Sequence, residues 1–320
     1  MCCAVRFTRE QVVAHRSPTP TAGGLDTPSK PVGTAVKPAP FEYRRPLSLD
    51  AALATLAADG DEVSVLAGGQ SLVPLLNLRL AQPRVLMDIN HLEELSTIDA
   101  TSERLHLGAI SRARTVERHA QARQVLPVLS EALAHIGHPQ IRNRTTIGGN
   151  VSHADPASEL PAVLLALDGS VHLASAEGRR SVAACEFFQH VFTTARQAQE
   201  LVVGIEFPVV QGLHFKLAEV ARRHGDYAMA GAVIGLSCAD RRVADVRLAY
   251  FGVSTSPVRL FAVEDELRGA TVERGFAERA GEAVREAIEP LGDLHAPAEY
   301  RRSLVATLTL RTVQSLLEAA

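Results

Sequence analysis

The sequence predicts an α+β fold in two domains, and three observations lead to that prediction. The chain has 320 residues, a length that allows two or three domains and a sizeable core. Up to Pro208, short apolar segments typical of strands alternate with helical patterns. Beyond Pro208 the strand patterns lengthen and are followed by helical ones, so we expect a smaller α+β domain to begin near residues 210–213.

Composition and charge indicate an ordinary globular protein and argue against several classes of function. Hydrophobic residues make up 46% of the chain and charged residues 22%. The formal net charge of −3, without a basic run, does not suggest a nucleic-acid-binding protein. The longest apolar stretch, Pro161–Leu167, is too short for a membrane span, and the N-terminus lacks a secretory pattern. We therefore expect a cytoplasmic protein.

The four cysteines, Cys2, Cys3, Cys185 and Cys238, have none of the spacings typical of zinc sites or iron–sulfur clusters. We expect no metal site on this chain, so if the protein transfers electrons, the metal centres lie on another chain. Small and apolar residues flank Cys185 and Cys238, which predicts that both are buried, inert thiols.

Residues 1–36 differ from the rest of the chain. The stretch SPTPTAGGLDTPSKPVGTA (17–35) is rich in Pro, Thr, Ser and Gly and has no periodicity. We expect it to be a disordered extension, because it offers too little apolar area to offset the entropy cost of ordering. One hypothesis is that translation starts at Val36 and that residues 1–35 are not native; the intact mass of the natively expressed protein tests it.

The elements of the first half follow from caps, periodicity and glycines. Ser48 is placed to cap a helix whose apolar face ends at Gly60. Val63–Leu66 is typical of a short buried strand, and Ser71 is placed to cap a short helix through Leu78. Further strands are expected at 85–89 and 105–109, and a helix at 125–136.

The second half continues with a helix at 158–167, whose Pro161 falls in the first turn, where a missing N–H costs little. Strands are expected at 171–174, 181–184 and 201–207. In the C-terminal domain, the patterns predict strands at 227–237 and 243–252 and helices at 258–267, 276–288 and 298–317.

Two segments with adjacent glycines, AGGQS at 67–71 and TIGGN at 146–150, are candidate anion-binding turns. Glycine lets a ligand approach the backbone because it has no Cβ, and successive N–H groups can converge on an anion. In the first segment the expected donors are the amides of residues 68–72 and the Ser71 hydroxyl. In the second, we expect contributions from the Thr146 hydroxyl, the Gly148 and Gly149 amides and the Asn150 side chain.

Polar groups follow the second segment, and His153, Asp155 and Glu159 suit the hydroxyls of a sugar or ribityl chain. Two such turns suit a long ligand with a diphosphate in the middle. Neither turn matches the G-x-G-x-x-G or G-x-x-x-x-G-K-[ST] fingerprints. A single Gly-Gly turn is more often only a turn, so on the residues alone that alternative stays open.

Longer stretches around both segments carry a resemblance to a known family. VLAGGQSLVPLLNLRLAQPRVLMDIN (65–90) and HPQIRNRTTIGGNVSHADPASELPAVLLAL (138–167) resemble the two FAD signatures of the medium subunits of molybdenum hydroxylases, the family of aerobic carbon monoxide dehydrogenase and xanthine dehydrogenase. The resemblance extends over nearly all of residues 37–318. It implies a two-lobed PCMH-type (vanillyl-alcohol-oxidase-like) FAD-binding domain over 37–212, with lobes of about 37–97 and 98–212, and a CO dehydrogenase flavoprotein-like α+β domain over 213–318.

The same resemblance assigns cofactor-binding roles and no catalytic residue on this chain. The residues implied to wrap the FAD pyrophosphate are Ala67, Gly68, Gly69, Gln70, Ser71 and Leu72. Those implied to line its other side are Thr146, Gly149, Asn150 and His153. Asp155 and Glu159 would contact the ribityl and ribose region, Val202 would approach the isoalloxazine, and Tyr227 would lie on the loop that covers the ring.

Several points stay open at this stage. His153 is read as a polar contact to a non-covalent FAD, with a covalent flavin anchor as the alternative. Arg142 and Arg144 either steer the FAD phosphates or form surface pairs. Relatives commonly have glycine where Thr145 stands, and some carry a flavin-proximal lysine where this chain has Ala218, with Lys216 displaced from that place.

The function implied is that of an electron-transfer subunit of a complex. A large molybdopterin subunit would oxidise the substrate, a small subunit would carry two [2Fe–2S] clusters, and the assembly would be a dimer of heterotrimers. FAD on this chain would pass the electrons to NAD, a quinone or oxygen. The alternatives are a self-contained FAD-dependent oxidoreductase of the PCMH fold and a nucleotide-binding interaction module without enzymatic activity.

Overall fold

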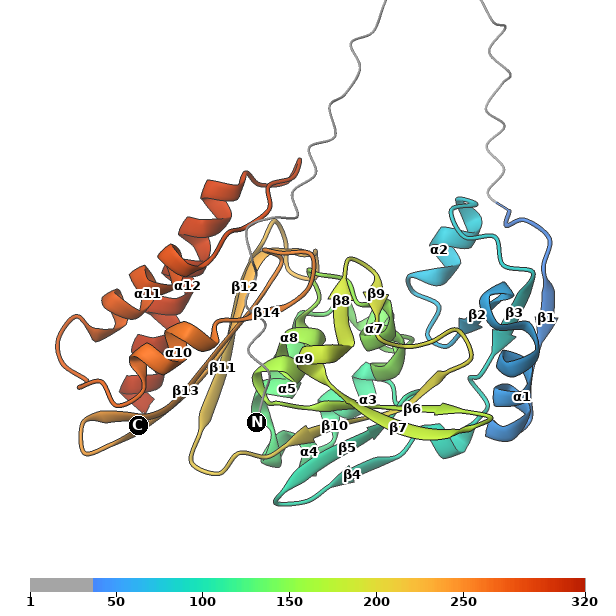
Figure 1. The fold of residues 1–320 in the computed structure, drawn as a ribbon, viewed down its shortest axis with the longest axis horizontal. Coiled ribbons are helices and arrows are strands. Elements are labelled where there is room, and N and C mark those ends of the chain that lie inside the picture. Colours follow the sequence, from blue (N-terminus) through green and yellow to red (C-terminus); the bar gives the residue numbers. More distant parts are fainter. Residues whose placement is uncertain (1–36, 320) are drawn as a thin grey trace, which may run out of the picture. The chain divides into compact units, whose positions relative to one another are not determined.

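The computed structural model describes residues 37–319, which form the α+β fold that the sequence predicts. The hypothesis on the N-terminal extension lies outside these residues. Four sheets are present in the described chain, and Figure 1 shows how the helices lie against them. None of the described helices has the length and apolar character that a membrane crossing requires.

A small parallel sheet in the order β1-β3-β2 begins the fold. Its strands are β1 (Glu42–Arg44), β2 (Val63–Leu66) and β3 (Val85–Asp88), with helices α1 (Leu49–Asp59) and α2 (Leu72–Asn77) and the 3₁₀ turns η1 (Gly60–Glu62) and η2 (Glu93–Leu95) in the connections. The Ser48 hydroxyl accepts a hydrogen bond from the Ala51 amide, so the predicted cap of α1 is confirmed. Buried leucines of α1 pack with Met87 and with Leu201 of the next sheet.

The central sheet has five antiparallel strands in the order β4-β5-β10-β6-β7. They are β4 (Ile98–Ala100), β5 (Arg104–Gly108), β6 (Ser170–Ser175), β7 (Gly178–Ala183) and β10 (Leu201–Pro208). The helices are α3 (Ala113–Arg118), α4 (Ala120–Val125), α5 (Pro127–His135), α6 (Pro139–Arg142), α7 (Ile147–His153), α8 (Glu159–Ala166) and α9 (Ala184–Phe187), and β8 (Phe188–His190) pairs with β9 (Thr193–Thr194). The buried side chains of this sheet and these helices form the largest core.

The last sheet is antiparallel, in the order β11-β12-β13-β14, with three helices after it. Its elements are β11 (His214–Ala221), β12 (Ala228–Ala239), β13 (Arg242–Phe251), β14 (Val258–Arg259), α10 (Phe261–Leu267), α11 (Phe276–Ala287) and α12 (Ala298–Ala319). Side chains alternate between two cores: Val233 and Phe251 face the central core, whereas Ile234 and Tyr250 face the C-terminal helices. Strand β12 is apolar from Ala228 to Leu236 because both faces of this sheet are covered.

The structure corrects the predicted elements at several places. The helix expected at 125–136 is broken at Leu126, because helical backbone angles are disfavoured for the residue before Pro127 and Leu126 has φ −142° and ψ 70°. Strand β11 was not predicted, and the helix expected at 258–267 begins only at Phe261, after β14.

Cys185 and Cys238 are exposed, so the prediction that both are buried thiols is wrong. Cys238 follows a register shift near the end of β12, where the strand runs past the covered part of the sheet. Cys185 lies on the outer side of the one-turn helix α9.

Candidate functional site

A single cleft of about 520 Å³ collects every residue that the sequence singled out as a cofactor contact. We call residues 67–72 the first glycine segment and residues 144–150 the second glycine segment. The fourteen predicted residues that line the cleft are Ala67, Gly68, Gly69, Gln70, Ser71, Leu72, Thr146, Gly149, Asn150, His153, Asp155, Glu159, Val202 and Tyr227. These residues come from the segment after β2, from α7 and the start of α8, from β10 and from the loop before β12.

The two glycine segments lie directly against each other. A Cβ built on Gly68 would stand 2.6 Å from the Arg144 carbonyl oxygen and 3.0 Å from the Thr145 Cα. A Cβ on Gly149 would come within 3.8 Å of the Ala67 Cβ. Glycine at position 68 is therefore required by contact with the opposite backbone, and the two segments form adjoining walls of one cleft.

The first glycine segment presents a row of free donors. Gly69 has φ +75°, a left-handed conformation that reverses the chain between β2 and α2 and that glycine adopts without strain. Within residues 37–319, the five successive amides of residues 68–72 have no hydrogen-bond acceptor. The Ser71 side chain does not cap α2, so its hydroxyl is also left for another partner. This arrangement is an anion cradle made from main-chain N–H groups.

The second glycine segment is built differently from the expected turn. Its glycines occupy the first turn of α7, and the Thr146 hydroxyl accepts a hydrogen bond from the Gly149 amide at 3.1 Å. The Gly148 amide donates to the Ala109 carbonyl at 2.8 Å. The expectation that these two amides are free donors is therefore wrong, because folding already uses both.

Close packing explains the glycines of the second segment. A Cβ on Gly148 would meet the Ala109 carbonyl oxygen at 2.7 Å, and one on Gly149 would meet the Thr146 hydroxyl at 2.6 Å. One donor that the segment leaves for a ligand comes from a side chain. The Asn150 Oδ1 accepts from the Ser158 hydroxyl at 2.9 Å, and this fixes the amide so that its Nδ2 remains available.

An arginine that the sequence analysis missed links the second glycine segment to Asn90, which follows β3. The Arg112 Nη1 donates to the Arg144 carbonyl, and its Nη2 donates to the Asn90 Oδ1 at 2.6 Å. The Asn90 Nδ2 lies 2.6 Å from the Asp88 Oδ1, at the end of β3. Burial lowers the pKa of Arg112, and the neighbouring Arg144 lowers it further. No motif marked Arg112, because its partners are distant in sequence.

The two arginines that were left open now have definite places. Arg142 is buried, and it donates to the Gly137 carbonyl at 2.8 Å and to a Glu117 carboxylate oxygen at 2.9 Å. It holds the loop before α6 and does not line the cleft. Arg144 is exposed, and its part in the site is its backbone carbonyl, which accepts the hydrogen bond from Arg112. A different cation, Arg196, does line the cleft, and no motif in the sequence marks it.

A buried acidic group closes one end of the cleft. Glu159, at the start of α8, is 6% exposed, and burial raises its pKa to about 8, with the nearby Glu219 adding to the effect. The Glu219 Oε1 lies 2.9 Å from the His135 Nδ1, and this contact raises the pKa of His135. The Glu219 Oε2 is buried and has no hydrogen-bond partner among the described residues. A protonated Glu159 can both donate and accept hydrogen bonds, which suits a polyhydroxyl ligand.

The remaining predicted residues border the cleft at other points. His153 stacks on Phe192 with ring centroids 4.8 Å apart, and burial lowers its pKa, which favours the neutral imidazole. Val202 is buried on β10, and Tyr227 is 68% exposed in the loop before β12. Lys216 does not line the cleft, and its Nζ donates to the Ser315 hydroxyl at 2.6 Å.

Comparison with known proteins shows the family of this chain. Residues 39–210 match the model of the FAD-binding domain in molybdopterin dehydrogenase, and residues 214–316 match that of the CO dehydrogenase flavoprotein C-terminal domain. The chain belongs to the FAD-binding medium subunits of molybdenum hydroxylases.

Individual relatives resemble this medium subunit over almost their whole length. The caffeine dehydrogenase subunit beta of a Pseudomonas species (strain CBB1) is 38% identical over 280 residues, which are 87% of this chain and 95% of that protein. The carbon monoxide dehydrogenase medium chain of Hydrogenophaga pseudoflava is 32% identical, over 87% of this chain and 97% of its own. The structure of quinoline 2-oxidoreductase from Pseudomonas putida 86 superposes with a TM-score of 0.85 at 34% identity, covering 89% of this chain and 99% of that chain.

Proposed function

We propose that this medium subunit binds FAD non-covalently in the 520 Å³ cleft and transfers electrons from a partner's [2Fe–2S] clusters to an external acceptor. The row of five amides without an acceptor, at residues 68–72, carries the proposal. Hydrogen bonds from such donors to a charged group contribute roughly 1.5–3 kcal/mol each, so a few of them suffice to anchor a pyrophosphate.

The other predicted residues complete the proposed site. The Thr146 hydroxyl, Gly149 and the Asn150 side chain face the amide row from the second glycine segment and border the same ligand. His153, Asp155 and Glu159 supply polar groups for ribityl and ribose hydroxyls, and Glu159 does so in its protonated form below about pH 8. Val202 packs against the ring system, and Tyr227 lies at the rim over it.

Bound FAD supplies the redox chemistry, since it takes up two electrons and can release them one or two at a time. The chain itself holds and orients the cofactor. Buried Val202 keeps water from one wall of the cleft, and Arg112 links the Arg144 carbonyl of the second glycine segment to Asn90. The cleft needs no acid or base for substrate oxidation, because that reaction belongs to another subunit in this proposal.

The names of the relatives support a role within a complex, because they describe a subunit beta or a medium chain. We propose a large molybdopterin subunit and a small subunit with two [2Fe–2S] clusters as partners, in a dimer of heterotrimers. NAD, a quinone and oxygen are the candidate acceptors.

The FAD site is tested by Gly69→Val, measured as flavin content after reconstitution and as quenching of FAD fluorescence. We expect loss of binding, because a β-branched residue is strained at φ +75° and its Cβ would lie 3.1 Å from the Leu66 side chain. Gly269→Val is the matched control: its φ is +81°, but no atom lies within 4 Å of the added Cβ. Equal FAD affinity in both variants would contradict the proposed cradle.

Electron transfer is tested with dithionite-reduced holoprotein mixed with NAD, a quinone or oxygen. Flavin reoxidation at a turnover-relevant rate by one of the three identifies the acceptor. Substrate oxidation by the purified chain without other subunits would instead favour the self-contained oxidoreductase.

A further inference from the structure

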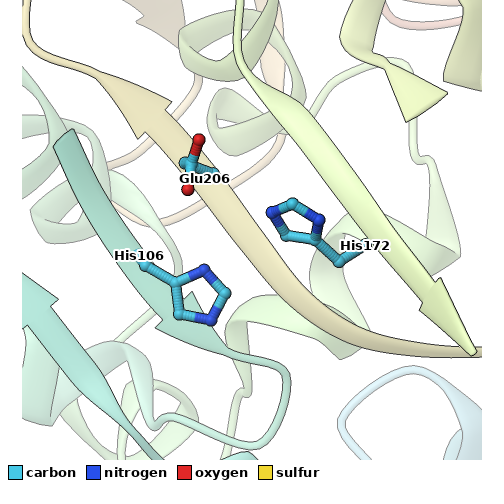
Figure 2. A group of neighbouring side chains, drawn as sticks. All are labelled: His106, His172 and Glu206. Atoms are coloured by element: carbon cyan, nitrogen blue, oxygen red, sulfur yellow. The ribbon is translucent and has the colours of Figure 1, made fainter. Parts of the chain in front are cut away.

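Two histidines and a glutamate gather on the outer face of the central sheet, on three neighbouring strands (Figure 2). His106 lies on β5, Glu206 on β10 and His172 on β6. Glu206 is the direct cross-strand partner of His106, and His172 is opposite Gly204 in the register of β10 with β6. One ligand atom from each side chain lies within 4.8 Å of the other two.

Glycine at position 204 leaves the space between the two imidazoles. A Cβ at this position would stand 2.7 Å from the His106 Cε1 and 3.0 Å from its Nε2. The ring centroids of His106 and His172 are 5.4 Å apart and tilted by 43°, so the rings do not stack on each other. Strand β10 therefore separates the two histidines, and Gly204 leaves the space between their rings open.

The cluster opens into a groove of about 600 Å³ that is separate from the flavin cleft. The three side chains are half-buried, so they are partly shielded from water but accessible to a small ion. The Arg104 Nη1 donates to the Glu206 Oε2 at 2.9 Å, which orients the carboxylate and leaves its other oxygen as a ligand. Asp99, 3.5 Å from the Arg104 guanidinium, partly offsets the charge of that arginine.

We propose that His106, His172 and Glu206 bind one divalent transition-metal ion of the zinc type. Two imidazole nitrogens and one carboxylate oxygen form a ligand set typical of such ions, with a position left for water, whereas magnesium and calcium prefer all-oxygen sites. Zinc–ligand bonds of about 2.0–2.2 Å require ligand atoms about 3.4 Å apart, so the side chains must close in from their present spacing by small rotations.

A metal ion at this position links three adjacent strands. Strand β10 is the middle strand of the three and also carries Val202, which lines the flavin cleft. The ion therefore acts as a clamp on the sheet that supports the cofactor site, and its binding raises the unfolding temperature as the metal concentration rises.

The test is titration of the untagged, metal-free full chain with Co²⁺, followed by visible absorption, and with Zn²⁺, followed by calorimetry and elemental analysis. We expect about one ion per chain, a cobalt spectrum of a nitrogen–oxygen site, and a metal-dependent rise in the unfolding temperature. His172→Gln and Glu206→Gln should each weaken Zn²⁺ binding at least tenfold.

The control is His190→Gln, which removes an exposed imidazole from β8 outside the cluster. Bound flavin reports folding in every variant, and all variants keep the cysteines, so thiol-bound metal is common to them. Retained flavin with lost metal binding in His172→Gln, and unchanged metal binding in His190→Gln, supports the site. Absence of stoichiometric metal in the unmodified chain, or equal binding by His172→Gln, overturns it.

Discussion

Replacing Glu159 with glutamine should change how the stability of the flavin-free protein depends on pH. Burial raises the pKa of this carboxyl from its ordinary 4.5 to about 8, and the nearby Glu219 adds to the shift. Between pH 4.5 and about 8, Glu159 is protonated in the folded chain and ionised in the unfolded chain. The contribution of this proton to the free energy of unfolding is therefore complete below pH 4.5 and is lost as the pH rises through about 8.

The magnitude follows from the separation of the two pKa values. A difference of about 3.5 pH units, at about 1.4 kcal/mol each, sets an upper limit of about 5 kcal/mol on the stability lost above pH 8. Glutamine has the same shape and never ionises. We therefore expect the free energy of unfolding of Glu159→Gln to rise relative to that of the unmodified protein as the pH increases, by up to about 1.4 kcal/mol per pH unit across this window.

The assay is urea unfolding of flavin-free protein at several pH values from 5 to 9, with the free energies of the two proteins subtracted. Subtraction removes most of the contribution of His135, whose raised pKa also makes stability fall with rising pH. Glu186→Gln, which alters an exposed carboxylate on α9, is the matched control. A constant difference for Glu159→Gln would refute the reasoning.

Three further substitutions test other parts of the structure. Gly68→Ala should abolish FAD binding measured by fluorescence, because its Cβ would stand 2.6 Å from a carbonyl oxygen of the second glycine segment; normal affinity would contradict the packing. Arg112→Met should raise the FAD dissociation constant about 10- to 100-fold, as expected for losing a charged hydrogen bond of about 1.5–3 kcal/mol. Arg259→Met should lower the free energy of unfolding by about 3–5 kcal/mol in urea, because it leaves the buried Glu264 unpaired, whereas exposed Arg274→Met should have little effect.

The local elements could largely be predicted from the sequence. The strand at Val63–Leu66 and the Ser48 cap are confirmed, because short-range signals decide them: an apolar run bounded by glycines, and a hydroxyl next to free amides. Predictions were wrong where a proline interrupted an apolar helical pattern, as at the break before Pro127, and where a strand extends beyond the covered part of its sheet, as at Cys238.

The sequence alone determined that two glycine segments exist, that both lie beside polar residues, and that their signatures belong to a flavin-binding family. Only the tertiary structure decided what each glycine does. Gly68 and Gly148 are glycines because another backbone lies against them, and the Gly149 amide is used within its own helix turn. Among the glycines of the two segments, the amides without an acceptor in the described chain are therefore those of Gly68 and Gly69. Arg112 and the cluster of His106, His172 and Glu206 depend on contacts between distant strands and loops, and such contacts leave no pattern in the sequence of any one segment.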